Sequence, residues 1–238
     1  MNHARDPLYR RHRFPAEVIS YAVWLYFRFP LSLRMVEEML AARGIIVSHE
    51  TIRCWAEKFG REFSNRIRRC APVRGDKWHL DEIGITIAGK KHWLWRAVDQ
   101  DGFVLDILVQ SRRDRAAAQR LMRKLLKKSA RAPRVMITDN LRSYGAARKD
   151  MGLHMEHRQY KGLNNRAENS HQPTRRRERI MKRFKSPRQV QKFLSIHDQL
   201  ANLFHIRLRE QTSAPDCRAF RDQAFAAWTE ITSAQLGA

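Results

Sequence analysis

The stretch from residue 78 to residue 139 constrains the fold most, because its hydrophobic periodicity changes along the chain. Residues 78–89, WHLDEIGITIAG, alternate apolar and polar side chains as a strand does, and two further strand patterns, HWLWRAV and FVLDILVQ, follow. Helical spacing then takes over in 114–128, and an all-apolar run, VMIT, ends before Asp139. These patterns predict a three-stranded meander, a crossover helix and a buried fourth strand in parallel pairing.

Two aspartates of this stretch are candidate ligands. Asp81 has the same parity as Ile83 and Ile85 in the first predicted strand, so its carboxylate would lie on an otherwise apolar face, which is costly without a partner or a metal. Asp139 follows the buried strand, and open α/β sheets bind ligands at the ends of their strands. If these two strands are neighbours, the two carboxylates converge. Turn, cap or solvated positions account for the other acids of the region: Asp99, Asp101, Asp106, Asp114, Asp150 and Glu156.

A third acid, Glu168, lies inside a run dense in arginine and amide side chains, NNRAENSHQPTRRRER. Two interpretations of it are open. Asn165 can cap a helix whose third position is Glu168, which would make a capping box; alternatively, Glu168 binds a metal ion while the arginines bind phosphate. On a helix, Glu168, His171 and Arg175 share one face. Pro173 is expected to bend that helix after His171.

Three helices are predicted before residue 78. The first begins at Pro15, Ser32 caps the second, and Ser48 caps the third. Gly44 lies between the second and third helices, where a left-handed backbone is favoured. This order fits a helix-turn-helix, and an ordinary helical subdomain is the alternative. The third helix would display outward the side chains of His49, Glu50, Arg53 and Lys58.

The charge balance points to a polyanionic partner. Lys and Arg total 47 against 24 Asp and Glu, which gives a formal net charge of +23. A basic arm at 9–13 and a basic linker at 61–74 would follow a DNA backbone, with a disordered tail as the alternative for the arm. No signal peptide or membrane span is expected. The three cysteines are too few and too scattered for a disulfide framework or a zinc site, which favours a reducing, cytoplasmic and nucleoid-associated location.

These motifs together resemble the DDE transposases and retroviral-type integrases, and most closely the small transposases of insertion-sequence family six. The resemblance rests on HLDE, on TDNLRSYG after the crossover helix and on EHRQYKGLNNRAEN, and it extends to HETIRCW in the third helix. It implies an α/β fold of the ribonuclease-H-like type, a mixed five-stranded sheet flanked by helices, behind an all-α helix-turn-helix domain. The domains would be 1–75, 76–212 and 213–238, the last being a helical tail.

The resemblance also implies a chemistry. Asp81, Asp139 and Glu168 would be the catalytic triad and would hold two Mg²⁺ ions, which Mn²⁺ can replace. Only 28 residues lie between Asp139 and Glu168, fewer than is usual in this group. The chain would bind inverted-repeat ends as at least a dimer, nick them and join their 3′-hydroxyls to target DNA. The residues expected to contact DNA are Arg53, Lys58, His171, Arg175, Arg176, Arg177, Arg179 and Lys182.

Two other classes of protein remain open. A non-catalytic helix-turn-helix regulator would bind DNA without cutting it, and a ribonuclease-H-like nuclease would cut DNA without joining it. The presence of all three acids argues against the regulator.

Overall fold

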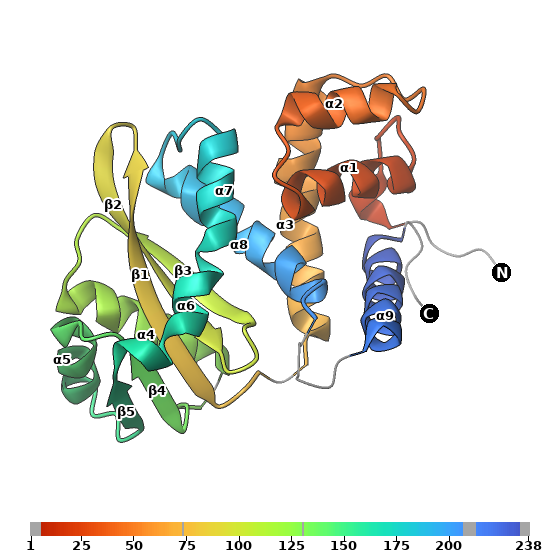
Figure 1. The fold of residues 1–238 in the computed structure, drawn as a ribbon. Coiled ribbons are helices and arrows are strands. Elements are labelled where there is room, and N and C mark those ends of the chain that lie inside the picture. Colours follow the sequence, from red (N-terminus) through yellow and green to blue (C-terminus); the bar gives the residue numbers. More distant parts are fainter. Residues whose placement is uncertain (1–5, 73, 130, 207–212, 234–238) are drawn as a thin grey trace. The chain divides into compact units, whose positions relative to one another are not determined.

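The computed structural model describes residues 6–72, 74–129, 131–206 and 213–233, and the chain forms two compact units (Figure 1). The first unit combines the N-terminal helices up to Ala71 with the chain from Ile196 onward, and the second consists of Pro72–Ser195. This division differs from the expected boundaries, because the last helix packs with the N-terminal helices and is not a separate tail. The expected boundary at residue 212 lies outside the described residues.

The second unit is built on a five-stranded sheet in the order β3-β2-β1-β4-β5. Its strands are β1 (Lys77–Ile87), β2 (Lys90–Asp99), β3 (Val104–Gln110), β4 (Val135–Thr138) and β5 (Glu156–Gln159). The first three pair antiparallel, while β4 pairs in parallel with both β1 and β5. The predicted meander, the buried fourth strand and its parallel pairing are thus confirmed, and β5 is the strand that no sequence pattern indicated.

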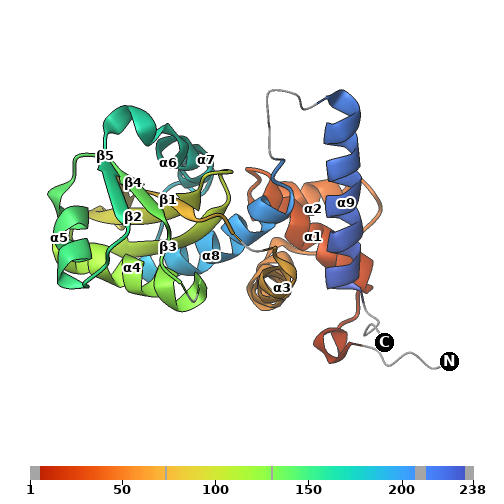
Figure 2. The ribbon, with the colours of Figure 1, turned by 90° about the horizontal axis from the view of Figure 1, so that it is seen from below.

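Helices cover both faces of this sheet (Figure 2). One face carries α4 (Arg115–Ser129) and α5 (Arg142–Asp150), and Leu80, Trp95 and Leu121 belong to the core beneath them. The other face carries α6 (Asn165–Ser170) and α7 (Gln172–Ile180), which follow a 3-10 turn at Lys161–Leu163. The helix α8 (Pro187–Leu203) begins in this unit, where the Gln191 side chain accepts a hydrogen bond from the Val109 N–H of β3 at 2.9 Å. The ribonuclease-H-like fold class is therefore confirmed.

The first unit is helical throughout its regular structure. Its elements are η1 (Pro7–Tyr9), α1 (Ala16–Arg28), α2 (Leu33–Ala41), α3 (His49–Cys70) and α9 (Ala214–Thr232). Ser32 and Ser48 cap α2 and α3 through their hydroxyls, as predicted. Gly44 has φ +74°, a left-handed backbone that glycine adopts without strain. The three predicted helices and the glycine turn are confirmed, whereas DNA reading by α3 stays a prediction.

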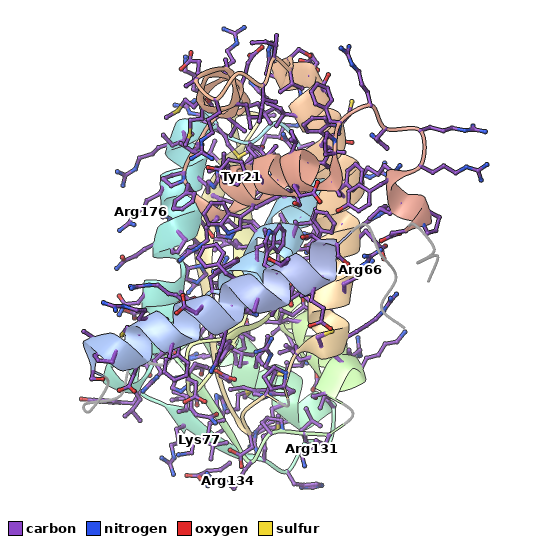
Figure 3. All side chains as sticks on the ribbon, turned by 90° about the vertical axis from the view of Figure 1, so that its right-hand side faces the viewer. Tyr21, Arg66, Lys77, Arg131, Arg134 and Arg176 are labelled. Atoms are coloured by element: carbon purple, nitrogen blue, oxygen red, sulfur yellow. The ribbon has the colours of Figure 1, made fainter. Side chains whose placement is uncertain are left out.

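The basic arm packs against α3 and α9. The Tyr9 ring stacks on Phe59 with the ring centroids 5.0 Å apart, and the Tyr9 hydroxyl donates to the carbonyl of Thr232 at 2.6 Å. Just before the arm, the Asp6 carboxylate pairs with the guanidinium of Arg66, a side chain labelled in Figure 3, at 2.5 Å. The disordered-tail interpretation is therefore wrong for the residues from Asp6 on, because aromatic packing and a buried ion pair hold this segment.

The predicted basic linker is mostly helix. The helix α3 continues to Cys70, so Arg61, Arg66 and Arg68 are helical residues, and the connection to β1 begins only at Ala71. Across the described ranges, every helix is too short or too polar to cross a bilayer. The thiols of Cys54, Cys70 and Cys217 are free.

Candidate active site

Asp81, within β1, and Asp139, which follows the end of β4, lie beside each other on adjacent strands. Leu80 of β1 is in register with Thr138 of β4, so the residue after each lies at the same level on adjacent parallel strands, about 4.8 Å apart. Asp81 is only 8% exposed. Burial, with the charge of Asp139 as the second cause, raises the pKa of Asp81 to about 6. The structure therefore brings together the two aspartates that the sequence placed on neighbouring strands.

His171 lies against Asp81 at the junction of α6 and α7. Its Nε2 is 3.2 Å from Oδ2 of Asp81, and the residue is 3% exposed. His171 ends α6 and precedes α7, and Pro173 occupies the first turn of α7, where a proline is tolerated. The expected break thus falls at His171 itself. The ring is buried and faces the Asp81 carboxylate, and the expectation that His171 contacts DNA stays a prediction.

Two buried side chains hold this junction on the sheet. The Asn164 amide donates to the carbonyl of Leu80 at 2.9 Å, next to Asp81 in the chain. Arg96, which is paired with Asp81 in the β1–β2 register, donates to the carbonyl of Ser170 at 2.5 Å and to the Thr174 hydroxyl at 2.9 Å. The start of α6 and the start of α7 are both fixed over the strands that carry the candidate site.

Glu168 is not the capping residue that the sequence allowed. The helix α6 begins at Asn165, its N-cap is Asn164, and the N-cap side chain makes no capping hydrogen bond. The Glu168 side chain is exposed and lies three residues before His171, so both project from one face of the helical segment. Among the described residues, no three His, Cys, Asp or Glu side chains are arranged to hold a metal ion. The aspartate pair alone is assembled.

Sequence reasoning missed a second network, centred on Glu82. Its side chain is 0% exposed and accepts hydrogen bonds from the Tyr144 hydroxyl at 2.7 Å and from Nε of Arg113 at 2.8 Å. Arg113 also lies 3.8 Å from Asp139, and its guanidinium stacks over Trp93. Burial raises the pKa of Glu82 to about 7 against the opposing effect of both hydrogen bonds. The available signal was the HLDE motif itself, because alternation along a strand places consecutive acids on opposite faces.

The predicted DNA-contacting cations separate into buried and exposed ones. Arg177 is 2% exposed and its guanidinium packs on the Phe193 ring at 5.3 Å, so its assignment to the DNA surface is corrected. Arg176 is exposed on α7 (Figure 3), and Arg179 and Lys182 are exposed near the end of that helix. In α3, the exposed Arg53 pairs with Glu50 at 3.2 Å and Lys58 contacts His12 at 2.9 Å.

The aspartate pair fits a divalent cation. Carboxylate oxygens are the ligands that Mg²⁺ prefers, and a bound cation would offset both causes of the raised pKa of Asp81, burial first and the charge of Asp139 second. Glu168 would be the third oxygen ligand only if its exposed side chain turned toward the pair. The chemistry of these donors suits binding and positioning of a phosphoryl group through metal ions.

Comparison with known proteins identifies the family. A family model described as a DDE domain, of the IS240 transposase type, matches residues 75–207. The transposase for insertion sequence element IS257 in transposon Tn4003 of Staphylococcus aureus is 34% identical over 131 residues, which are 55% of this chain and 58% of that protein. The transposase for insertion sequence-like element IS431mec of Staphylococcus aureus strain N315 matches to the same extent.

Among solved structures, a cryoEM structure of the simian T-cell lymphotropic virus intasome in complex with PP2A regulatory subunit B56 gamma matches with a TM-score of 0.40 and 13% identity, covering 59% of this chain and 52% of that chain. The chain spans about 58% of the length of the transposases it matches. Because the DDE-domain model matches more than half of the sequence, this chain belongs to the IS240-type DDE transposases of insertion-sequence family six.

Proposed function

We propose that this chain binds the inverted-repeat ends of an insertion sequence, nicks them and transfers their 3′-hydroxyls into target DNA. The observation that carries the proposal is the convergence of Asp81, within β1, and Asp139, just after the end of the adjacent parallel strand β4, with His171 of the α6–α7 junction against Asp81. Membership of the family supports the same conclusion. The relatives are longer than the matched region, so the substrate and the assembly belong to the proposal.

Divalent metal ions are typical cofactors of DDE transposases. In this chain Asp81 and Asp139 would hold two Mg²⁺ ions together with Glu168, and Mn²⁺ would substitute. When bound, such ions lower the pKa of a water or 3′-hydroxyl nucleophile and stabilise the leaving oxygen at phosphorus. The protein's own contribution is placement: Asn164 and Arg96 fix the helical junction, and His171 orients the Asp81 carboxylate.

Glu168 is near enough to this junction for the proposed role. It lies one helical turn before His171, and side chains at that spacing have Cβ atoms about 5–6 Å apart. Its side chain is exposed, so it would have to turn toward the aspartates to join them as a ligand. This is the step in the proposal that depends on the bound metal.

The DNA-binding part of the proposal rests on charge and on the helical unit. The chain has a formal net charge of +23, and α2 and α3 are joined by the turn at Gly44. Arg53 and Lys58 are exposed cations of α3 that would contact DNA, and Arg176, Arg179 and Lys182 extend positive charge along α7 and just past its end. Two ends have to be held together, so at least a dimer is expected.

The test is Mg²⁺-dependent strand transfer on DNA carrying the inverted repeats that flank the coding sequence. Asp81→Asn, Asp139→Asn and Glu168→Gln should each abolish joining while leaving DNA binding intact. Persistence of joining in any of these variants would overturn the assignment of that residue. Cutting without joining by the unaltered protein would identify a nuclease, and binding without cutting would identify a regulator.

A further inference from the structure

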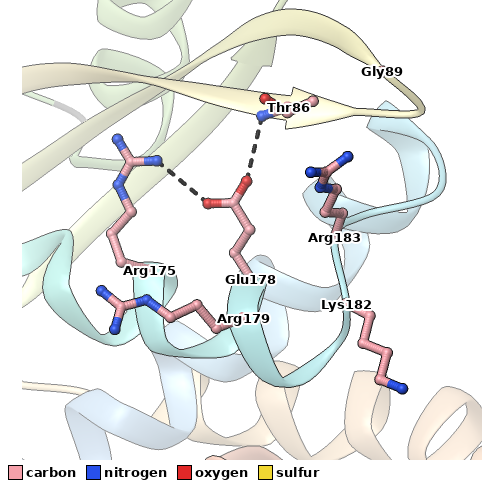
Figure 4. Close-up of a pocket in the computed structure, with 7 residues that line it drawn as sticks. All are labelled: Thr86, Gly89, Arg175, Glu178, Arg179, Lys182 and Arg183. Atoms are coloured by element: carbon pink, nitrogen blue, oxygen red, sulfur yellow. Dashed lines mark hydrogen bonds and ion pairs between the residues drawn. The ribbon is translucent and has the colours of Figure 1, made fainter.

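A basic pocket lies at the hairpin end of β1, beyond Asp81 along the strand. It has a volume of about 660 Å³, and Figure 4 shows that it is formed between the tip of the β1–β2 hairpin, at Thr86 and Gly89, and the end of α7. The remaining lining side chains are Arg175, Glu178, Arg179, Lys182 and Arg183. Four cations and one carboxylate thus surround one opening, which suits an anion.

The single carboxylate of this pocket already has partners. Oε1 of Glu178 accepts a hydrogen bond from the Thr86 N–H at 3.3 Å, and Oε2 is 3.3 Å from Nη1 of Arg175 (Figure 4). Within the described ranges, Arg179, Lys182 and Arg183 form no ion pair with any carboxylate. Glu178 therefore compensates Arg175 and ties α7 to the hairpin, and the positive charge of the other three side chains is left for a ligand.

The backbone at Lys182 and Arg183 is unusual for residues with side chains. Their φ angles are +48° and +74°, the left-handed region that glycine normally supplies after a helix. The Arg183 N–H closes α7 on the carbonyl of Glu178 at 2.9 Å, and the buried Phe184 accepts from the Ala88 N–H at 3.2 Å. The backbone that carries both cations is consequently fixed beside the hairpin, although glycine would suit this backbone better.

Stability of the helix end does not account for these side chains. The carboxyl end of a helix favours cations, which explains Arg179 in the last turn of α7. Lys182 and Arg183 follow the helix in a conformation that disfavours them, and strained backbone that persists in this way is concentrated at functional sites. The two residues are therefore best explained by what their charges bind.

The distance from the pocket to the aspartates can be obtained along two elements. Thr86 is five residues beyond Asp81 on β1, or about 17 Å at 3.4 Å per residue. Arg179 is eight residues beyond His171, or about 12 Å of helix. Because successive phosphates of one strand are about 3.4 Å apart along a duplex axis, these lengths correspond to about four or five base pairs.

We propose that this pocket binds a backbone phosphate of duplex DNA about four or five base pairs from the phosphate at Asp81 and Asp139. The proposal rests on the proposed function for the position of the reacting phosphate, and it adds a second contact that sets the register of DNA on the catalytic unit. Duplex DNA is favoured over a small anion because the pocket and the aspartates lie along one strand and the net charge is +23.

The test uses the full chain carrying Lys182→Gly and Arg183→Gly. Glycine removes both charges and suits the left-handed backbone, so the melting temperature should not fall. Binding to inverted-repeat duplex, followed by fluorescence anisotropy at several salt concentrations, should weaken, and the slope of log K against log salt should shrink by about 1 to 2. Arg123→Gln and Lys127→Gln, which remove two exposed cations from α4 without placing glycine in a helix, are the charge-matched comparison and should change neither the affinity for duplex DNA nor the salt slope.

Neutral methylphosphonates placed one at a time along the duplex locate the contact. Replacement four or five base pairs from the nicking position should weaken binding of the unaltered protein, and it should have no further effect on the double glycine variant. If the variant loses no more affinity than the α4 comparison, or if both proteins respond equally to every methylphosphonate, the pocket does not bind DNA. Where the glycine variant proves unfolded, Lys182→Gln with Arg183→Gln replaces it in the same measurements.

Inorganic phosphate distinguishes the two sources of the anion. If phosphate alone shifts the melting temperature of the unaltered protein and not of the glycine variant, while duplex affinity is equal in both, the pocket is a free-phosphate site and the proposal fails. Failure of the proposed function has a different signature, because strand transfer would then survive Asp81→Asn. In that case a methylphosphonate effect at the predicted spacing would not appear, and the register proposed for the pocket would fail with it.

Discussion

Asp81 and Glu82 are consecutive acids of β1 whose surroundings differ in kind. Glu82 faces α4 and α5, where the Tyr144 hydroxyl and the Arg113 guanidinium both donate to its carboxylate. Asp81 faces α6 and α7, where it meets His171 and a second carboxylate, Asp139. In the described part of the chain, no lysine or arginine forms an ion pair with Asp81. Burial raises the pKa of both acids, to about 7 for Glu82 and about 6 for Asp81.

The difference teaches how a raised pKa should be interpreted. A buried carboxylate enclosed by fixed donors is satisfied by the protein, so Glu82 has a structural role in joining β1, α5 and the segment before α4. Asp81 lies beside a second carboxylate. The Arg113 guanidinium is 3.8 Å from Asp139 and hydrogen-bonded to Glu82, so a bound cation would add compensation that the protein supplies only in part. Both acids have perturbed pKa values, yet only the surroundings of Asp81 suit catalysis.

The largest expected effect separates the two acids by activity. Asp81→Asn should lower Mg²⁺-dependent strand transfer by more than about 100-fold, because removing groups that merely support a metal ligand already costs about 10- to 100-fold. Its free energy of unfolding should not decrease, since the repulsion with Asp139 is removed. Strand-transfer assays and urea unfolding of the same preparation check both results. A variant that keeps its activity would break the comparison.

The next effect is a pH dependence specific to Asp81. Its pKa of about 6 in the folded protein lies above the ordinary value of 3.8, so folding disfavours the ionised form. The stability associated with protonated Asp81 is full below about pH 4 and is lost as pH rises through about 6. Without metal, the unaltered protein should lose about 2 kcal/mol relative to Asp81→Asn across that window, as measured by urea unfolding with a chelator present.

Added Mg²⁺ extends this experiment. It should restore the lost stability of the unaltered protein near pH 7 and leave Asp81→Asn unchanged, because only the paired carboxylates bind the ion. If the free energy of unfolding varied with pH in the same way for the two proteins, with or without Mg²⁺, the protein itself would already compensate the charge of Asp81.

A smaller effect is expected from Arg113. Arg113→Gln leaves the buried Glu82 carboxylate with the Tyr144 hydroxyl as its one remaining side-chain donor, and should lower the free energy of unfolding by about 1–2 kcal/mol. The expected loss of stability is no larger because the Arg113 side chain is 37% exposed, and solvent weakens its interaction with Glu82. Arg112→Gln, at the exposed neighbouring arginine, should stay within about 0.5 kcal/mol in the same urea titration. Equal effects of the two substitutions would remove Arg113 from the network.

The smallest effect is expected from Tyr144→Phe. The hydroxyl is the only group removed, so the cost should be about 1 kcal/mol from the lost hydrogen bond to Glu82. Thermal unfolding measures this loss of stability. If Glu82 has no catalytic role, strand transfer should change by less than about 2-fold. A loss of activity as large as that of Asp81→Asn would place Glu82 in the reacting site.

Periodicity made most of the sheet predictable, and the exceptions have physical reasons. The strands β1 to β4 alternate or are wholly apolar, and the convergence of Asp81 with Asp139 followed from placing β4 beside β1. The strand β5 has the sequence EHRQ and mostly exposed residues, so it carries no hydrophobic pattern. It forms because its backbone pairs with β4, which no local composition reveals.

The site was less predictable because charged residues were interpreted from sequence neighbours alone. Arg177 has the same side chain as its exposed neighbour Arg176, but it is buried and its guanidinium packs on Phe193, an aromatic residue of a later helix. Glu82 was overlooked because its partners, Tyr144 and Arg113, lie on other elements. Such pairings depend on tertiary structure, whereas the glycine turn at Gly44 and the serine caps are local and were found.

The most direct test of the contrast between the two acids is a titration with Mn²⁺, followed by electron paramagnetic resonance of the free ion. The unaltered protein should bind Mn²⁺, Asp81→Asn should lose that binding, and Glu82→Gln should retain it, because Asp81 lies beside a second carboxylate whereas Glu82 is enclosed by the Tyr144 hydroxyl and the Arg113 guanidinium. Loss of Mn²⁺ binding in Glu82→Gln with binding retained in Asp81→Asn would contradict the account.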